Sequence, residues 1–376
     1  MRYLAEYVSP GHPDRLADAI ADGIVRLAMS RDPDSLVGVE VALHRNTVFV
    51  DGRIAGGICD PVVCEDDIVR IVRSVYAKAG YSDFWKPNPD DLHVVADLSI
   101  EALGDDERAI RNISDDQNVV RGYALNCPET EYFPPAHFAV LRLGRELVLK
   151  NASSAGLLGP DFKLLACVSD DGNDGLRWDR LVFSCQHSDA LDNSEVHSLL
   201  KRNVSDSLSA CFGGNRVLKG LSSISGASLC MNGAGDFIIG GPNGDNGLSG
   251  KKLAVDFYGT EIPIGGGAIY GKDYHKADVA GAYKARQFAL FLVRKTGARS
   301  VETRLAWAPG EEVPCDIEAW SVDEFGLRIR ISSDLFPPSD WFSLQCASSE
   351  LMRKPVRKQE GWNGREYDCG LSRIIF

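Results

Sequence analysis

Apolar residues recur along much of the chain at the spacing of amphipathic helices. Over residues 14–29 they fall on one helical face, which predicts a helix there. The same spacing predicts helices near 65–78, 136–149 and 194–208. A further helix follows residue 278 and is predicted to end at Gly297, after two basic residues. Its closely packing face consists of Val279, Ala282, Ala285, Ala289 and Leu292.

Alternating apolar and polar positions predict strands elsewhere. The runs 36–43 and 47–50 are joined by Arg45 and Asn46, so a β-hairpin is predicted. Further strands are expected around Leu164 and over 181–185 and 253–257. Because 376 residues are too many for one ordinary core, the pattern predicts an α/β (α+β) fold of two or three packed units, with sheets on one face.

Between Leu98 and Asn118 the composition shifts to acidic and polar residues. A mobile polar segment is therefore predicted there. It can act as a lid over a site or remain a solvated loop, and the sequence leaves both interpretations open.

The overall charge restricts the classes of ligand. Lysine and arginine number 41 against 53 acidic residues, giving a net charge of −12, and no basic stripe is interleaved with aromatic residues. Nucleic-acid binding is therefore not expected, and any phosphate ligand must meet locally clustered cations. No stretch reaches the roughly 18 apolar residues of a membrane span, and no signal peptide is recognised. Ten scattered cysteines without a C-x-x-C pair are typical of reduced thiols in a cytoplasmic protein.

Three segments carry residues suited to chemistry, and the first is Ser9–Arg15. It places an imidazole, a carboxylate and a guanidinium around two prolines just before a predicted helix. Such a helix N-terminus can face an anion. Taken alone, the residues favour a plain turn in which Asp14 caps the helix and His12 is solvated.

The second segment, 233–252, is dense in glycine and ends in Lys251 and Lys252. Its glycines permit close backbone approach and positive φ angles. The lysines arrive where the loop is expected to re-enter a strand. A ligand-binding loop is favoured over a flexible surface hairpin.

The third segment, 265–278, contains G-x-x-x-x-G-K at Gly266–Lys272. Asp273 stands where a P-loop needs Ser or Thr for its metal, and a second lysine, Lys276, follows four residues after the first. These features favour a different kind of phosphate-binding loop.

Together the three segments resemble the S-adenosylmethionine synthetase (methionine adenosyltransferase) family. The family's GHPD motif stands at 11–14, and its two glycine-rich motifs recur in order as GGPNGDNGLSGKK at 240–252 and GGGAIYGKDYHKAD at 265–278. The resemblance covers nearly the whole chain. Shorter matches are Glu6, Glu40, Asp116–Gln117, Gly122–Ala124, Asp161, Lys163 and Ser184–Ser188, with a faint echo at Gly361–Arg365.

The resemblance implies three similar α/β units per subunit, which we place at 1–110, 111–221 and 222–376, with the units interleaved. It implies a homodimer or dimer of dimers with active sites shared between subunits. In the implied reaction the sulfur of L-methionine attacks C5′ of ATP, and the released triphosphate is hydrolysed before S-adenosylmethionine leaves. Two magnesium ions and potassium are the implied cofactors.

Site residues are implied by the matched motifs. His12 would lie against the leaving-group oxygen, Asp14 and Asp278 would bind magnesium, and Glu40 would bind potassium. The implied catalytic lysines are Lys163, Lys272 and Lys276. The implied ATP-binding residues are Lys251 and Lys252 at the phosphates, Phe237 on adenine, and Asp116, Asp161, Asp245 and Ala268.

The chain departs from the family pattern at the implied acceptor pocket. Arg53 stands in place of a glutamate, Glu101 in place of a glutamine, and Pro309 in place of an isoleucine that lines the sulfur pocket. Near the phosphates Arg15 replaces a lysine and Asp236 replaces an arginine. Since charge swaps alter which ligand charges are satisfied, Arg53 and Glu101 are expected to reorient the amino acid or to select a different thioether or other acceptor.

Three functions remain open at this point. The first is methionine adenosyltransferase activity. The second is a divergent enzyme that uses another acceptor or only hydrolyses ATP or tripolyphosphate. The third is a non-catalytic nucleotide-binding subunit. Retention of His12, Asp14, Lys163 and Asp278 argues against the third, because a pure binder needs no leaving-group or metal residues.

Overall fold

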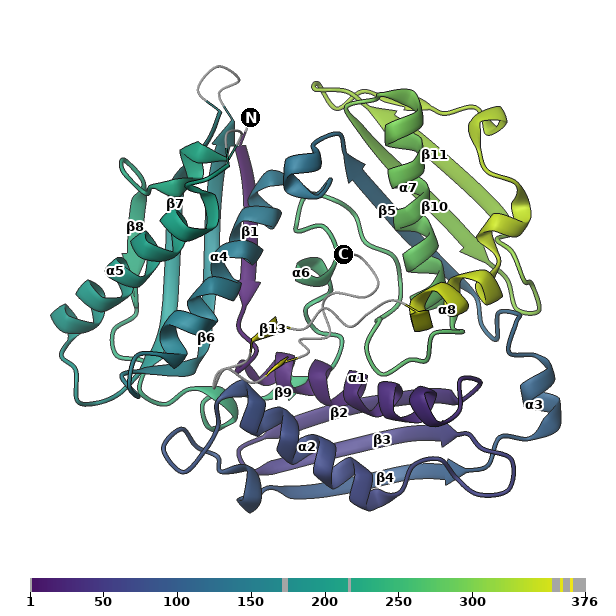
Figure 1. Ribbon diagram of the computed structural model, residues 1–376, viewed down its shortest axis with the longest axis horizontal. Helices are drawn as coiled ribbons and strands as arrows, with labels where there is room; N and C mark the ends of the chain where they lie inside the picture. The colour runs from purple at the N-terminus through teal and green to yellow at the C-terminus, as the bar shows by residue number, and fades with distance from the viewer. Residues whose placement is uncertain (1, 171–174, 216–217, 354–358, 361–365, 368–376) are drawn as a thin grey trace.

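Three four-stranded sheets form most of the fold, and helices cover one face of each (Figure 1). The computed structural model describes residues 2–170, 175–215, 218–353, 359–360 and 366–367. The faint match at Gly361–Arg365 lies outside these residues. The predicted α/β fold class is confirmed, whereas the unit boundaries near 110 and 221 stay predictions.

The first sheet has the strand order β1-β6-β7-β8. Helix α4 (Pro135–Ala152) packs on β1 and β6, and α5 (Asn193–Phe212) packs against α4 and β8. The N-terminal strand pairs antiparallel with β6, which places Val8 opposite Lys163. The strands are β1 (Arg2–Val8), β6 (Leu158–Asp170), β7 (Leu176–His187) and β8 (Ser228–Met231).

The second sheet has the order β4-β3-β2-β9, and α1 (Pro13–Arg31) and α2 (Glu65–Ala79) cover its inner face. Strands β2 and β3 form the predicted hairpin, and β4 runs parallel to β3. The fourth strand, β9, comes from a distant part of the chain. The strands are β2 (Leu36–His44), β3 (Thr47–Ala55), β4 (His93–Glu101) and β9 (Gly247–Leu248).

The third sheet has the order β12-β11-β10-β5. Helix α7 (Ala282–Thr296) packs on β5 and β10, and it continues a π-helical turn at Ala277–Gly281. It ends at Gly297, which adopts φ 67°, as predicted. Helix α8 (Leu344–Arg353) packs against the π-helical turn. The strands are β5 (Asn118–Leu125), β10 (Ser300–Trp307), β11 (Asp316–Val322) and β12 (Arg328–Arg330).

Short elements connect the sheets. They include helices α3 (Asp105–Ala109) and α6 (Leu253–Asp256). The pair β13 (Gln359–Glu360) and β14 (Glu366–Tyr367) forms a separate two-stranded sheet after α8. Short 3-10 turns lie at Pro89–Asp91, Pro128–Thr130, Lys219–Ser222, Gly241–Asn243, Ser333–Leu335 and Ser339–Phe342. Among the described helices, none combines the length and the apolar character that a membrane crossing requires.

The helices predicted from periodicity are confirmed, because their apolar faces are buried. In α1 the side chains of Leu16, Ile20 and Ile24 have no exposed surface. Pro13 occupies the first turn, and His12 Nδ1 accepts a hydrogen bond from the Asp14 backbone N–H at 3.2 Å. The turn interpretation of this segment is therefore wrong, since His12 rather than Asp14 caps the helix and His12 is buried.

The strand predicted at 253–257 is also wrong. Residues 253–256 form helix α6, whose first turn is closed by the Lys252 carbonyl accepting from the N–H groups of Val255 and Asp256 at 2.9 and 3.0 Å. A five-residue apolar run carries too little periodicity to distinguish a strand from a helix. The buried carboxylate of Asp256 decides the conformation through contacts with α1, described below.

The predicted polar segment is more ordered than its composition indicates. Residues up to Glu101 complete β4, and α3 follows. Arg108 pairs with Asp32 at 2.8 Å and with Asp34 at 2.9 Å. Arg111 donates to the carbonyl oxygens of Asp34 and Ser35. The segment is thus tethered beside the C-terminal end of α1.

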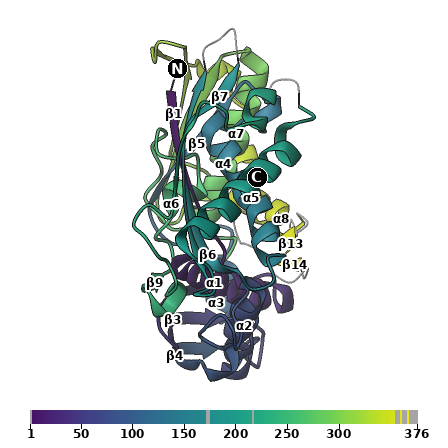
Figure 2. The same ribbon diagram turned by 90° about the vertical axis from the view of Figure 1, so that its left-hand side faces the viewer.

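The sheet faces that the helices leave open carry exposed apolar side chains. In the side view the long helices α4, α5 and α7 lie toward one side of the molecule (Figure 2). The exposed apolar residues on these open faces are Leu4 and Leu165 in the first sheet, Phe49, Val95 and Leu248 in the second, and Val119 in the third.

A substitution at Gly122 would test how closely α7 packs on β5. A Cβ at this position would lie 2.0 Å from the Ala285 carbonyl oxygen and 2.4 Å from the Thr303 hydroxyl. We expect Gly122→Ala to lower the free energy of unfolding by about 2–3 kcal/mol, because the helix must move away from the strand. Urea unfolding followed by circular dichroism measures the change.

The matched control is Gly214→Ala, where no atom lies within 4 Å of an added Cβ. Its stability should remain within about 1 kcal/mol of the parent chain. Equal stability of the two variants would contradict the close approach of α7.

Candidate functional site

Both glycine-rich segments lie along the same edge of strand β2. At one end of that edge Leu43 pairs with Gly247, and at the other the Val39 N–H donates to the Gly271 carbonyl oxygen at 2.8 Å. A single bridge joins Gly38 to Lys272. The edge therefore gathers the lysines of two segments that are distant in sequence.

Two glycines permit this arrangement. Gly271 has φ +75°, and a Cβ there would lie 1.9 Å from the Val39 carbonyl oxygen. Gly250 has φ +71°, and its Cβ would lie 2.8 Å from that of Ala268. The two loops therefore touch, and Ala268 lies beside the turn that carries Lys251 and Lys252.

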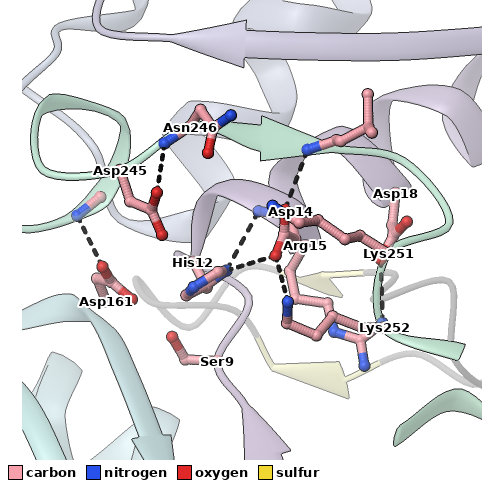
Figure 3. Close-up of polar contacts among 12 residues, drawn as sticks. Ser9, His12, Asp14, Arg15, Asp18, Asp161, Asp245, Asn246, Lys251 and Lys252 are labelled. Atoms are coloured by element: carbon pink, nitrogen blue, oxygen red, sulfur yellow. Dashed lines mark hydrogen bonds and ion pairs between the residues drawn. The ribbon is translucent and has the colours of Figure 1, made fainter. Parts of the chain in front are cut away.

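The first charged cluster surrounds the N-terminus of α1 (Figure 3). The Asp14 carboxylate is 2% exposed, accepts the Leu248 N–H at 3.0 Å and pairs with Lys252. Lys251 lies 3.8 Å from the same carboxylate. Hydrogen bonds from Lys252 and Leu248 outweigh burial and lower the pKa of Asp14.

His12 is neutral in this cluster. Burial, reinforced by the charge of Lys163, lowers its pKa to about 3. Because Nδ1 accepts the Asp14 N–H, the ring hydrogen is assigned to Nε2. The imidazole can therefore act as a hydrogen-bond donor at neutral pH.

Lys163 lies beside His12 on the open face of the first sheet. It shares a hollow of about 310 Å³ with Glu6, Ser184 and Lys252. Two predicted phosphate-binding lysines from different segments thus line one cavity next to the N-terminus of α1.

The predicted nucleoside residues lie on the other side of His12. Asp161 Oδ2 accepts the Gly241 N–H at 2.7 Å, and Oδ1 has no hydrogen-bond partner among the described residues. Figure 3 shows Asp245 next to Asp161. Phe237 is fixed by two hydrogen bonds of 3.0 Å to His187, one through each residue's backbone N–H.

The second charged cluster lies near Gly38. Lys272 pairs with Asp278 at 2.5 Å and Lys276 pairs with Asp115 at 2.7 Å. Asp116, the predicted ATP-binding residue, is exposed, and its carboxylate accepts the backbone N–H of its neighbour Gln117. The sequence did not indicate that Asp115 is the partner of Lys276. Its position directly before Asp116, a predicted site residue, was the one available indication.

Asp273 explains why the third segment departs from a P-loop. Its side chain is fully buried, accepts the Val37 and His275 N–H groups at 2.9 Å each, and pairs with Arg111. This carboxylate fastens the loop to β2 and to the tethered polar segment. Asp273 therefore has a structural role, although it occupies the position at which a P-loop has its metal-binding Ser or Thr.

The structure joins two of the three predicted acceptor residues directly. Arg53 Nε lies 2.6 Å from Glu101, and its two terminal nitrogens bind Glu107 at 2.6 and 3.1 Å. The hydrogen bonds from Arg53 lower the pKa of Glu107. Pro309 lies apart from this group. The two residues that follow it, Gly310 and Glu311, each form a backbone hydrogen bond with Ser114. The sequence reasoning missed Glu107, although the unusual Arg53 implied that a carboxylate partner was needed.

Glu40 lies on the open face of β2, between the two charged clusters. It is opposite Asp51, which is opposite Asp97 on β4, so three carboxylates stand in one row. Like charges in neighbouring cross-strand positions repel one another, and a cation would offset that repulsion.

The metal ligands expected at this site are spread over both clusters. Among the described residues no three His, Cys, Asp or Glu side chains are grouped closely enough to hold a metal ion by themselves. Asp14 and Asp278 nevertheless offer hard oxygen donors beside lysines. Magnesium is commonly held by one or two carboxylates together with phosphate oxygens, so the residues fit that mode.

Comparison with known proteins finds one family. Residues 1–99 match the N-terminal domain of S-adenosylmethionine synthetase, and residues 239–334 match its C-terminal domain. The chain is 33% identical to the S-adenosylmethionine synthase of Pelagibacter ubique over 84% of this chain and 79% of that protein. It is 32% identical to that of Methylorubrum extorquens over 98% of this chain and 93% of that protein.

A solved structure shares the fold. It is described as an unusual S-adenosylmethionine synthetase from Campylobacter jejuni, and it superposes with a TM-score of 0.77 at 23% identity. The superposition covers 100% of this chain and 99% of that chain.

Asp161 allows a test of the site's electrostatics that does not depend on activity. Burial raises its pKa to about 6 from an ordinary value of 3.8. The folded state therefore holds an extra proton between these pH values, so stability falls as pH rises through this window. Asp161→Asn removes the effect and should be more stable than the parent chain at pH 7.5, by up to about 3 kcal/mol, but not at pH 4.

Urea unfolding at both pH values measures this difference. Asp245→Asn is the matched control, because it replaces an exposed rather than a buried carboxylate in the same part of the site. The same pH dependence in Asp161→Asn and the parent chain would show that the Asp161 carboxyl titrates normally.

Proposed function

Because the chain belongs to the S-adenosylmethionine synthetase family, we propose that it transfers the adenosyl group of ATP to the sulfur of L-methionine. The products are S-adenosylmethionine, phosphate and diphosphate, since the released triphosphate is hydrolysed at the same site. The observation that best supports this proposal is the set of lysine–aspartate pairs along one edge of β2.

The chemistry requires alignment and charge stabilisation rather than a base. A thioether sulfur is neutral and already nucleophilic, so no proton has to be removed from it. Aligning sulfur, carbon and leaving oxygen can supply roughly 7–11 kcal/mol of the barrier reduction. Preorganised cations stabilise the negative charge that develops on the triphosphate.

His12 acts on the leaving-group oxygen as a neutral donor. Its Nδ1 is engaged by the Asp14 N–H, which leaves the Nε2 hydrogen for the oxygen that departs from C5′. With a pKa near 3, the ring donates a hydrogen bond without becoming charged at neutral pH. The lysines supply the positive charge.

The lysine–aspartate pairs exchange partners when the substrate binds. In the structure Asp14 is paired with Lys252, and Asp278 with Lys272. The lysines turn to phosphate oxygens, and the two carboxylates would hold magnesium, which would supply positive charge that neutralises the triphosphate. Every charge keeps a partner throughout, which matters because an unpaired buried charge is costly.

The remaining predicted residues complete the site. Lys163, Lys251 and Lys276 add cations around the phosphates, and Phe237 stacks on adenine. Glu40 would hold potassium, whose charge would also offset the repulsion in its carboxylate row. The residues that fix the nucleoside and approach the phosphate chain are Asp116, Asp161, Asp245 and Ala268.

The proposed assembly is a homodimer, or a dimer of dimers, that buries the open sheet faces. Lys163 and the hollow it lines lie on one of these faces, and Glu40 lies on another. A partner subunit covering the exposed apolar residues would therefore also close the site, as expected for active sites shared between subunits.

A second candidate is transfer to a different acceptor, and the arrangement around Arg53 favours it. Both ends of this guanidinium are occupied, by Glu101 and Glu107, so its positive charge is already satisfied by two carboxylates of the chain. The carboxylate of a free amino acid must then compete with Glu101 and Glu107 for Arg53. A thioether or other acceptor of different charge would not face that competition.

One experiment separates these functions. The protein is incubated with ATP, magnesium, potassium and a panel of thioethers including methionine, and the products are resolved by mass spectrometry. Methionine-dependent S-adenosylmethionine supports the first candidate, and adenosyl transfer to another compound supports the second. ATP binding without any turnover would contradict both and indicate a nucleotide-binding subunit.

Lys163→Met should lower kcat in the productive reaction by roughly 100- to 1,000-fold, because a preorganised cation is lost at the phosphates. Lys201→Met, on the exposed face of α5, is the matched control and should leave kcat unchanged. Equal rates of the two variants would exclude Lys163 from the reaction.

The exchange of partners predicts that magnesium binding and nucleotide binding strengthen each other. Isothermal titration should detect no magnesium binding in the absence of nucleotide. An unhydrolysable ATP analogue should bind at least about tenfold more weakly in EDTA than with magnesium, since nucleotide alone leaves Asp14 without its lysine. Asp14→Asn should reduce this dependence, whereas Asp115→Asn should retain it. Tight magnesium binding to the protein alone would contradict the exchange.

A further inference from the structure

Arg15 is the centre of a buried ionic network next to the lysine pair. Its side chain is 3% exposed, and its Nη1 lies 3.0 Å from Asp18 and 2.5 Å from Asp256. Both carboxylates are buried as well. The Tyr270 hydroxyl donates to the same oxygen of Asp256 at 3.2 Å. One guanidinium thus joins α1, α6 and the 265–278 loop.

The network holds Lys251 and Lys252 from both sides. Asp18 Oδ1 accepts the backbone N–H of Gly250 at 2.8 Å, directly before the two lysines. On the other side, α6 starts directly after Lys252, whose carbonyl oxygen accepts the first helical hydrogen bonds, and Asp256 belongs to this helix. The lysine pair therefore sits in a short backbone stretch fastened at each end to Arg15 through a carboxylate.

The network contains two buried carboxylates and one buried guanidinium. These two carboxylates share Arg15, and burial raises the pKa of Asp18 to about 7 and also raises that of Asp256. Nε and Nη2 of Arg15 have no hydrogen-bond partner among the described residues, so a single nitrogen makes both contacts. A compact ammonium group at this position could make the same two contacts.

We propose that Arg15 is a positioning residue, which fixes Lys251 and Lys252 against Asp14 through Asp18 and Asp256 without itself touching the substrate. This inference rests on the proposed function, because it assigns the lysine pair to the triphosphate. Arg15 follows Asp14 in the first turn of α1, so the same turn carries the carboxylate and the group that positions its lysine partner. The distance between the two is thereby set within one rigid element.

A purely structural role predicts a different outcome. Loss of a buried ion pair lowers stability wherever it lies, but only a positioning residue changes triphosphate binding beyond what lost stability explains. Lys284 offers the comparison, since its fully buried ammonium pairs with Glu350 at 3.1 Å and joins α7 to α8. Lys284→Met removes a buried cation outside the network.

The experiment measures binding of an unhydrolysable tripolyphosphate analogue with magnesium to the full chain by isothermal titration, together with thermal unfolding. Arg15→Met should weaken binding at least about tenfold, while Arg15→Lys should stay within about threefold of the parent chain. Asp18→Ala should also weaken binding, because the Gly250 N–H loses its acceptor. Asp18→Asn, which keeps an acceptor oxygen, should bind almost normally. Lys284→Met should bind normally even if it unfolds at a lower temperature.

The outcomes separate the two levels of inference. If the parent chain does not bind the tripolyphosphate analogue, the proposed function is wrong. If the parent chain binds it, two results would show that the positioning role is wrong. One is that Arg15→Met binds equally well, and the other is that Lys284→Met weakens binding as much as Arg15→Met does. Should Arg15→Met fail to fold, equal binding by Asp18→Ala and Asp18→Asn overturns the proposal.

Discussion

Compensation of the buried charge on Asp14 is the constraint on which the candidate site depends. Removing a carboxylate from water is costly unless a counter-charge and hydrogen bonds replace the lost hydration. The counter-charge comes from Lys252, 238 residues away, and a hydrogen bond comes from Leu248 in β9. Both reach Asp14 only when β9 docks on β2. The position of the site and the pairing of the second sheet are therefore set by the same contacts.

Local patterns predicted much of this structure, and non-local contacts account for what they missed. The periodicity of α1, the β2–β3 hairpin and the glycine end of α7 each depend on neighbouring residues, so the sequence indicated them correctly. The alignment of two loops along one edge of β2 depends on pairings across more than 200 residues. Periodicity contains no information about such pairings, although the matched motifs named the right loops.

The errors have the same origin. Residues 253–257 were assigned to a strand because a short apolar run is ambiguous, and only Arg15, in another element, shows why Asp256 lies in a buried helical turn. Burial of His12 likewise depends on elements far away in the sequence. The partners of Arg53 and Lys276 could not be identified among the many acidic residues of the 98–118 segment without the fold that orients them.

The pairing of β9 with β2 also has a consequence for synthesis of the chain on the ribosome. Strands β2, β3 and β4 have all emerged once residue 101 is free, but the strand that completes their sheet begins at residue 247. Until then one edge of β2 presents unsatisfied backbone groups, which is a site for erroneous pairing between nascent chains. Efficient production of this protein therefore depends on protecting that edge during translation, and fragments that end before residue 247 should be prone to aggregate.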